Sequence, residues 1–171
     1  MGDLNDFINR LSGKWVAVGG NRWINSITSK KVKVIVNKLI NKRCKIITGG
    51  AEGVDHIVMR SCLEYKVPRN SLKIFLPYTM EQQYKHYCKL EGYKKASLLL
   101  NTLSKIKKLH PNSIIENKKQ LKNYRQAANY RNTLIIKKAD GAIFLKPEGS
   151  SGSLDAIKKI KTKKIPFLIF N

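Results

Sequence analysis

A short sequence pattern recurs three times along the chain and limits the folds that the chain can adopt. An apolar, β-branched run ends in a turn rich in glycine or serine, and a helical pattern follows at once. The copies lie at Val16–Gly20, Cys44–Asp55 and Ile143–Ser153. Glycines let backbone N–H groups approach a ligand, and the helix offers its positive N-terminal end to anions. The repetition predicts an α/β fold with anion-binding turns at strand ends.

Apolar periodicity extends this alternation over most of the chain. It predicts strands at Trp15–Gly19, Cys44–Thr48, Leu72–Leu76, Gly141–Leu145 and Phe167–Phe170. Helical patterns run over about 27–41, 52–66 and 124–138, a further helix opens at the serine turn, and residues 1–13 form an amphipathic lead-in. Alternating strands and helices indicate right-handed crossovers. We therefore expect one domain over residues 1–171: a three-layer, Rossmann-like α/β fold with a parallel sheet in the order 3-2-1-4-5.

The segment between the third and fourth expected strands is too long for one crossover. We expect a basic helical insert of one or two helices over about 78–123. Between Leu103 and Arg125, Glu116 is the sole acid. The basic residues of that stretch are Lys105, Lys107, Lys108, Lys118, Lys119, Lys122 and Arg125.

The charge of the whole chain is as skewed as that of the insert. Its 34 Lys+Arg against 11 Asp+Glu give a net charge of +23. Codon bias toward lysine does not explain this, because AT-rich codons supply acids as readily. Affinity for a polyanion is one explanation, and a merely solvated basic surface is the other. On the first, the candidate nucleic-acid contacts are Lys105, Lys107, Lys108, Lys118 and Lys119.

Other function classes find little support in the sequence. No apolar run reaches the length of a membrane span, and the N-terminus lacks signal architecture, so we expect a cytoplasmic protein without a membrane partner. The three cysteines lack CxxC spacing and are expected to be buried thiols. The three histidines have no ligand-like spacing, so no metal site is expected. The dinucleotide and P-loop glycine patterns are absent, and Ser153 stands where a nucleophile elbow needs glycine.

The candidate binding site follows from the expected strand order. Ligands of open parallel sheets bind outside the carboxyl ends of the strands, where the strand order reverses. There the three turns meet. The candidate ligand-binding residues are Gly19, Gly20, Arg22, Gly49, Gly50, Gly53, Asp55, Arg131, Asn132, Gly149, Ser150, Ser151, Gly152 and Ser153.

Each polar residue of this set has a structural interpretation beside the functional one. The serine hydroxyls suit a phosphate, but Ser151 or Ser153 also suits a helix cap, and both roles can coexist. Arg22 and Arg131 suit phosphate through their planar fork, or lie on a solvated surface. Asp55 suits ribose hydroxyls, or a helix N-terminus for purely structural reasons.

Three stretches of the chain resemble the SLOG superfamily of Rossmann-like nucleotide-binding proteins. They are GGAEGVD (Gly49–Asp55), YRNTLIIKKADGAIFL (Tyr130–Leu145) and GSSGSLDAIKKI (Gly149–Ile160). The superfamily includes DNA-processing protein A (DprA), the Lonely Guy (LOG) phosphoribohydrolases and YspA-type proteins. The resemblance covers about 14–76 and 124–171 but not the insert. It implies that the glycine turns, the Arg131-Asn132 pair and the serine turn surround a nucleotide or its phosphate.

The departures from the family patterns separate the possible activities. LOG enzymes place a catalytic glutamate where this chain has Ala156, and Asp155 would point about 100° away around the helix. The resemblance to DprA is better in the serine turn and the Arg-Asn pair, although DprA's second arginine is replaced by Thr133.

These observations lead to three hypotheses. The first is a nucleotide-binding or sensing domain without catalysis. The second is a DprA-like protein that binds single-stranded nucleic acid, and the third is a LOG-like N-glycosidic hydrolase of nucleoside monophosphates. The expected partner is a nucleotide-like small molecule, joined by nucleic acid on the second hypothesis. No cofactor is expected other than such a nucleotide, and a homodimer stays open.

Overall fold

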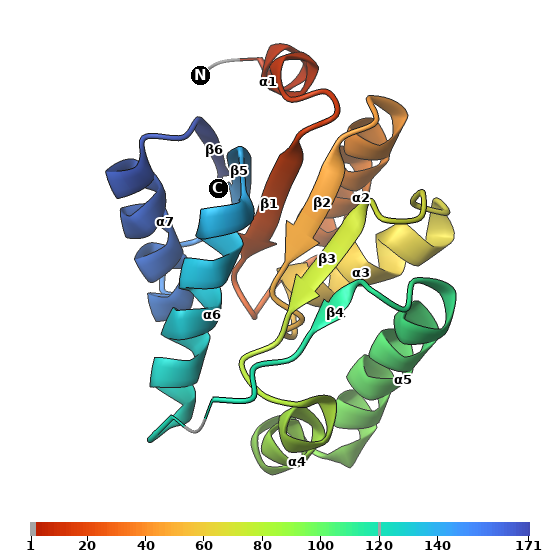
Figure 1. The fold of residues 1–171 in the computed structure, drawn as a ribbon, viewed down its shortest axis with the longest axis vertical. Coiled ribbons are helices and arrows are strands. Elements are labelled where there is room, and N and C mark those ends of the chain that lie inside the picture. Colours follow the sequence, from red (N-terminus) through yellow and green to blue (C-terminus); the bar gives the residue numbers. More distant parts are fainter. Residues whose placement is uncertain (1–2, 120) are drawn as a thin grey trace.

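The computed structural model describes residues 3–119 and 121–171 and contains a parallel sheet between two layers of helices (Figure 1). The strands are β1 (Trp15–Gly20), β2 (Lys45–Thr48), β3 (Leu72–Phe75), β4 (Ile114–Ile115), β5 (Gly141–Leu145) and β6 (Phe167–Phe170). Their order is β4-β3-β2-β1-β5-β6, and every pairing is parallel. The predicted fold class is confirmed, and the five predicted strands stand in the predicted order. The difference is β4, which lies in the insert and extends the sheet beside β3.

Seven helices accompany the strands in the described part of the chain. They are α1 (Leu4–Arg10), α2 (Ser26–Asn41), α3 (Val54–Glu64), α4 (Met80–Glu91), α5 (Tyr93–Leu109), α6 (Tyr124–Lys138) and α7 (Ser151–Lys163). One core packs α1 to α5 against one face of the sheet, and a second packs α6 and α7 against the other. None of these helices is long and apolar enough to cross a membrane.

Local sequence explains where the main elements begin and which face they bury. Asn25 accepts a hydrogen bond from the Thr28 N–H at 2.8 Å and so caps α2, whose buried stripe includes Val32, Val36 and Leu39. β5 is buried along its whole length, as a central strand of a parallel sheet covered on both faces must be.

The insert is a helical hairpin that forms part of the core. Thr79 and Gln82 form a reciprocal capping box at the start of α4, and Gly92 at φ 81° separates α4 from α5. Leu103 and Ile106 of α5 are buried with α3 in the first core. The insert therefore packs on the face of the sheet that α2 and α3 also cover, and these two helices follow the first two turns.

The three cysteines are free thiols. Cys44 and Cys62 are buried, whereas Cys88 is half-buried. Burial raises the pKa of the Cys44 thiol to about 11, which keeps it protonated at neutral pH.

Candidate functional site

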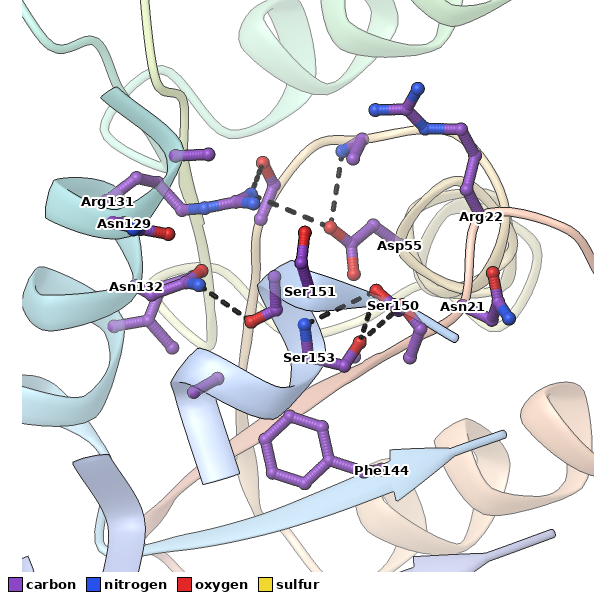
Figure 2. Close-up of a pocket in the computed structure, with 18 of the residues that line it drawn as sticks. Asn21, Arg22, Asp55, Asn129, Arg131, Asn132, Phe144, Ser150, Ser151 and Ser153 are labelled. Carbon is purple, nitrogen blue, oxygen red and sulfur yellow. Dashed lines mark hydrogen bonds and ion pairs between the residues drawn. The ribbon is translucent and has the colours of Figure 1, made fainter. Parts of the chain in front are cut away.

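The three turns meet at the carboxyl ends of β1, β2 and β5, where a cavity of about 420 Å³ opens (Figure 2). Of the predicted ligand-binding residues, those that line it are Gly19, Gly20, Arg22, Gly49, Asp55, Arg131, Asn132, Gly149, Ser150, Ser151, Gly152 and Ser153. The cavity, here called the crevice, lies where the strand order reverses between β1 and its neighbours β2 and β5.

Gly50 and Gly53 do not line the crevice but shape the loop behind it. The Gly50 carbonyl accepts a hydrogen bond from Gln83 Nε2 of α4 at 3.1 Å. Gly53 begins α3 with φ 81°, and a Cβ there would collide with the Asn21 and Arg22 carbonyls. These two glycines fit the loop against its neighbours.

Arg131 holds the second turn in place from the opposite layer of helices. Its Nη1 donates to the Gly49 carbonyl and lies 3.7 Å from Asp55 Oδ2. A side chain at Gly49 would collide with the guanidinium. Arg131 is buried, so this contact joins α6 to the β2–α3 turn. The solvated interpretation of Arg131 is therefore wrong, and the arginine has a structural function whatever it does for a ligand.

Asp55 is a carboxyl group whose charge is poorly stabilised. Burial raises its pKa above the ordinary value of 3.8, against the opposing effects of Arg131 and of the Ala51 N–H, which donates to Oδ2 at 3.3 Å. A protonated Asp55 would place a neutral donor on the crevice wall, where a carboxylate would repel an anion.

The serine turn forms the start of α7 and ties it to β1. Ser150 accepts from the Ser153 N–H at 3.3 Å, and Ser153 Oγ donates to the Gly20 carbonyl at 3.0 Å. The capping function is thus carried by Ser150, whereas Ser151 is exposed at the crevice. The first turn of α7 contains no acidic residue, so its partial positive charge is not neutralised.

Arg22 reaches the crevice from the first turn and is positioned by the insert. Its guanidinium lies 5.5 Å from the centre of the Tyr87 ring, and its Nη1 lies 3.9 Å from Glu91 Oε1. The insert therefore places a half-buried cation at the crevice.

Sequence reasoning missed several lining residues, among them Trp23, Arg125 and Asn129. Trp23 is 66% exposed beside Arg22, and Lys95 Nζ lies 5.2 Å from its ring centre. Arg125 and Asn129 share a helical face with Asn132 at the spacing i, i+4, i+7. This polar stripe is visible in the sequence and could have been found.

Asp155 precedes Ala156, the position at which LOG enzymes have their catalytic glutamate, and its carboxylate is bound by other side chains. Its Oδ2 accepts from Asn132 Nδ2 at 3.1 Å and lies 2.6 Å from Lys159 Nζ. Ala156, not Asp155, lines the crevice. Asn132 also donates to the Gly152 carbonyl at 2.9 Å, so it joins α6 to the start of α7.

The two tyrosines that border the basic stretch contact other side chains. The Tyr124 ring stacks on His86 with 4.0 Å between ring centres, and its hydroxyl lies 3.4 Å from that of Tyr87. Lys119 Nζ lies 4.5 Å from the ring centre of Tyr130.

The five candidate lysines do not form one cluster. Lys118 and Lys119 follow β4 and so lie at the carboxyl edge of the sheet, the edge of the crevice. Lys105, Lys107 and Lys108 lie near the end of α5, which leads into the amino end of β4. The sequence cluster is therefore divided between opposite edges of the sheet.

The amino edge gathers most of the uncompensated charge. We define the amino-edge basic surface as the basic residues in the last four positions of each helix that leads into a strand, and in the loop that follows. They are Arg10, Lys14, Lys38, Lys42, Arg43, Lys66, Arg69, Lys107, Lys108, Lys137, Lys138, Lys161, Lys163 and Lys164. The acids in the same segments are Glu64 and Asp140.

The carboxyl edge is nearly balanced by the same measure. The loops after the strands and the first four residues of the following helices carry these charges: Arg22, Lys118, Lys119, Lys122, Arg125 and Lys146, against Glu52, Asp55, Glu81, Glu116 and Glu148. The crevice therefore lies at the edge with little net charge.

A parallel sheet between two layers of helices, with glycine and serine turns at the carboxyl ends of its strands, defines the Rossmann-like class of α/β folds. Within that class, the family model described as DNA recombination-mediator protein A matches residues 6–166. The chain belongs to this family, which confirms the predicted resemblance. No match to the chain is found among curated proteins.

Solved structures show the same fold. DNA processing protein A from Helicobacter pylori, studied for its single-stranded DNA binding mode, matches with a TM-score of 0.69 and 20% identity over 98% of this chain and 68% of that one. DprA from Streptococcus pneumoniae matches with a TM-score of 0.64 and 18% identity over 95% of this chain. The match spans about half of the S. pneumoniae protein, 51%. The structural genomics target TM1055 matches with a TM-score of 0.55 and 15% identity over 90% of this chain and 72% of that one.

Proposed function

We propose that this chain binds single-stranded DNA and that the crevice receives one nucleotide unit of the strand. The observation that carries the proposal is the start of α7, where residues 150–153 line the crevice, Ser151 is exposed and the first turn contains no acid. A helix N-terminus of this kind favours a phosphate group. Membership in the DNA recombination-mediator protein A family makes a DNA strand the favoured source of that phosphate.

The surroundings of the crevice suit a polymer better than a free nucleotide. Arg22, in the loop after β1, and Arg125, on α6, both line the crevice, so we expect them to attract the phosphates on either side of the bound unit. Trp23 offers an exposed aromatic face next to Arg22, and unpaired bases stack on such faces. Free nucleotides would use the same phosphate position, so our first hypothesis shares its site with this proposal.

The positions of Asp155 and Ala156 do not support the hydrolase hypothesis. The carboxylate of Asp155 is paired with Lys159 and Asn132, and Ala156 stands at the crevice. Prolonged incubation with AMP, followed by chromatography, is therefore expected to give no free adenine. If adenine did form, its loss in Asp155→Asn would assign the activity to that acid.

The test fills the crevice without disturbing the fold. A Cβ at Gly152 meets no atom within 4 Å, so Gly152→Leu adds a side chain to open space at the lining, and Gly152→Ala is the matched control. Fluorescence anisotropy measures binding of a short labelled oligothymidylate, and the fluorescence of Trp23, which lines the crevice, reports whether the strand binds there. We expect Gly152→Leu to weaken that binding at least about tenfold, or about 1.4 kcal/mol, and Gly152→Ala to change it little.

Competition with mononucleotides separates the two ligands. Thymidine monophosphate should compete far more weakly than the oligonucleotide if adjacent units contribute contacts. Equal competition per nucleotide would favour the free-nucleotide hypothesis. Unchanged binding of the strand in a correctly folded Gly152→Leu variant would overturn the proposal.

A further inference from the structure

The charge that distinguishes this chain lies opposite the crevice. The amino-edge basic surface holds many cations and two acids, whereas the carboxyl edge is close to neutral. The strands run from one edge to the other, so the two surfaces lie at opposite ends of the strands (Figure 1). Binding in the crevice therefore leaves most of the basic surface without a ligand.

Helix dipoles explain only part of this charge. All the helices that lead into strands end at the amino edge, and each end carries about half a negative elementary charge, which cations stabilise. Lys163 acts in this way, because its Nζ donates to the carbonyls of Ile136 at 2.9 Å and Ala139 at 2.7 Å. The lysines and arginines of this edge nevertheless far exceed the roughly three charges that six such ends could offset.

Neighbouring acids do not neutralise the surface either. Within residues 3–119 and 121–171, none of its members forms an ion pair with an acid. The acid Glu64 pairs with Lys33, which lies outside the surface, at 2.8 Å. Asp140 accepts from the Trp15 N–H at 2.9 Å.

Contacts across the edge join its loops into a continuous surface. The ring centre of Trp15, the first residue of β1, lies 5.3 Å from Lys138 Nζ of the surface and 5.7 Å from Nζ of Lys45, the first residue of β2, so Trp15 lies between the segments that lead into β5 and β2. Arg69 and Lys108 border one hollow, which joins the loops before β3 and β4. Cations from both helical layers thus present one face.

We propose that the amino-edge basic surface is a second nucleic-acid site, which binds the phosphate backbone independently of the crevice. Most of its cations are lysines, which act as point charges and read no base sequence. A polymer with regularly spaced charges matches cations spread over several loops. An anionic membrane fits less well, because Leu109 is the sole large, strongly exposed apolar side chain on this edge among the described residues.

The two tryptophans of the chain allow each surface to be observed separately. Trp15 contacts Lys138 of the amino-edge basic surface, and Trp23 lines the crevice. Trp23→Phe leaves Trp15 as the reporter, and Trp15→Phe leaves Trp23. In the Trp23→Phe protein, a short oligothymidylate should change the fluorescence of Trp15 saturably, and added Gly152→Leu should leave that change intact.

Charge removal provides the second measurement. The test variant replaces Lys42, Lys108, Lys137 and Lys161 by glutamine, one in each of four connections. The control replaces Lys30, Lys89, Lys94 and Lys158, which are exposed and lie outside the surface, so both variants lose the same net charge. For single strands, removing the cation from one bound phosphate should reduce the slope of log K against log salt by about 0.7. We expect a reduction of that size or more in the test variant and a smaller one in the control.

The outcomes distinguish this proposal from that for the crevice. Loss of the Trp15 response in the test variant, with the Trp23 response retained, supports a second site. An absent Trp15 response, or equal slopes in the two variants, overturns it even if the crevice binds DNA. Binding of the surface to anionic phospholipid vesicles but not to oligonucleotides also overturns it. If the crevice fails to bind while Trp15 responds, only the proposed function falls.

Discussion

The two edges of the sheet use positive charge in opposite ways. At the carboxyl edge the important cation, Arg131, is buried, fixed to the Gly49 carbonyl and close to Asp55. At the amino edge the cations are mostly exposed lysines without acidic partners among the described residues. The carboxyl edge holds a cavity of defined lining and has little net charge. The amino edge carries a large positive charge spread over several loops. The difference shows that the excess positive charge and the crevice lie at different edges of the sheet.

The composition and the motifs of the chain therefore indicate different kinds of interaction. The glycine and serine turns concern where a single phosphate can approach the backbone. The lysine excess concerns long-range attraction, which is screened by salt and insensitive to base sequence. We expect the two edges to differ in stability, in response to pH and in the function of individual lysines.

The largest effect is expected from removing the buried cation of the crevice. Arg131→Ala leaves the Asp55 carboxylate buried without its partner and should lower the free energy of unfolding by about 3–5 kcal/mol. The fourfold glutamine variant of the amino edge should stay within about 0.5 kcal/mol per substitution, because its lysines are exposed. Urea denaturation followed by circular dichroism measures both.

A double variant tests the cause of that loss. Asp55→Asn added to Arg131→Ala removes the unpaired charge, so part of the lost stability should return. If the single arginine variant is as stable as the unmodified protein, the buried pair does not hold the turn. Equal destabilisation by the lysine variant would remove the contrast between the edges.

A smaller effect is expected when pH changes the charge of Asp55. Burial raises its pKa above 3.8, so its contribution to folding is present at low pH and is lost as pH rises through the folded-state pKa. Binding of an oligonucleotide in the crevice should weaken over the same interval, since the carboxylate repels phosphate. Phosphodiesters do not titrate there, so the ligand's charge stays constant.

The control for this pH effect is Asp55→Asn, which keeps the shape of the side chain and stays neutral. Its affinity for the oligonucleotide should be less dependent on pH than that of the unmodified protein. His86, close to Arg22, also loses charge with rising pH, but burial and Arg22 lower its pKa. An undiminished pH dependence in Asp55→Asn would assign the effect to another group.

The sequence predicted the fold because the buried stripes and strand runs are regular. β5 reads as five apolar or small residues in succession, and α2 buries the expected face. It did not predict β4, since the two residues Ile114 and Ile115 are too short a pattern to distinguish from a loop. Their pairing with β3 depends on the packing of α5, which no local pattern reveals.

The candidate site was predicted less completely than the fold. Turns with small residues mark the strand ends, so most of the crevice residues follow from chain order. The exposed side of Trp23 and the anchoring of Arg22 by the insert depend on contacts between distant segments. The lysines were misleading for the same reason: neighbours in sequence, such as Lys108 and Lys118, are separated by a whole strand of the sheet.

The smallest predicted effect separates structural from functional lysines on the amino edge itself. Lys163 Nζ donates to the carbonyls of Ile136, Lys137 and Ala139 at 2.9, 3.1 and 2.7 Å, so it satisfies carbonyl groups at the end of α6. Lys163→Gln should lower the free energy of unfolding by about 1 kcal/mol, whereas Lys161→Gln, exposed on the same helix, should cost less than about 0.5 kcal/mol. For nucleic-acid binding the order should reverse, because Lys161 is free to contact phosphate and Lys163 is occupied. Urea titrations and salt-dependent anisotropy on the two single variants measure both quantities.

Equal losses of stability would mean that the carbonyl groups at the end of α6 are satisfied without Lys163. A larger decrease in binding for Lys163→Gln would mean that the amino edge binds through its ordered cations, as the crevice is proposed to do, and would weaken the contrast drawn between the two edges.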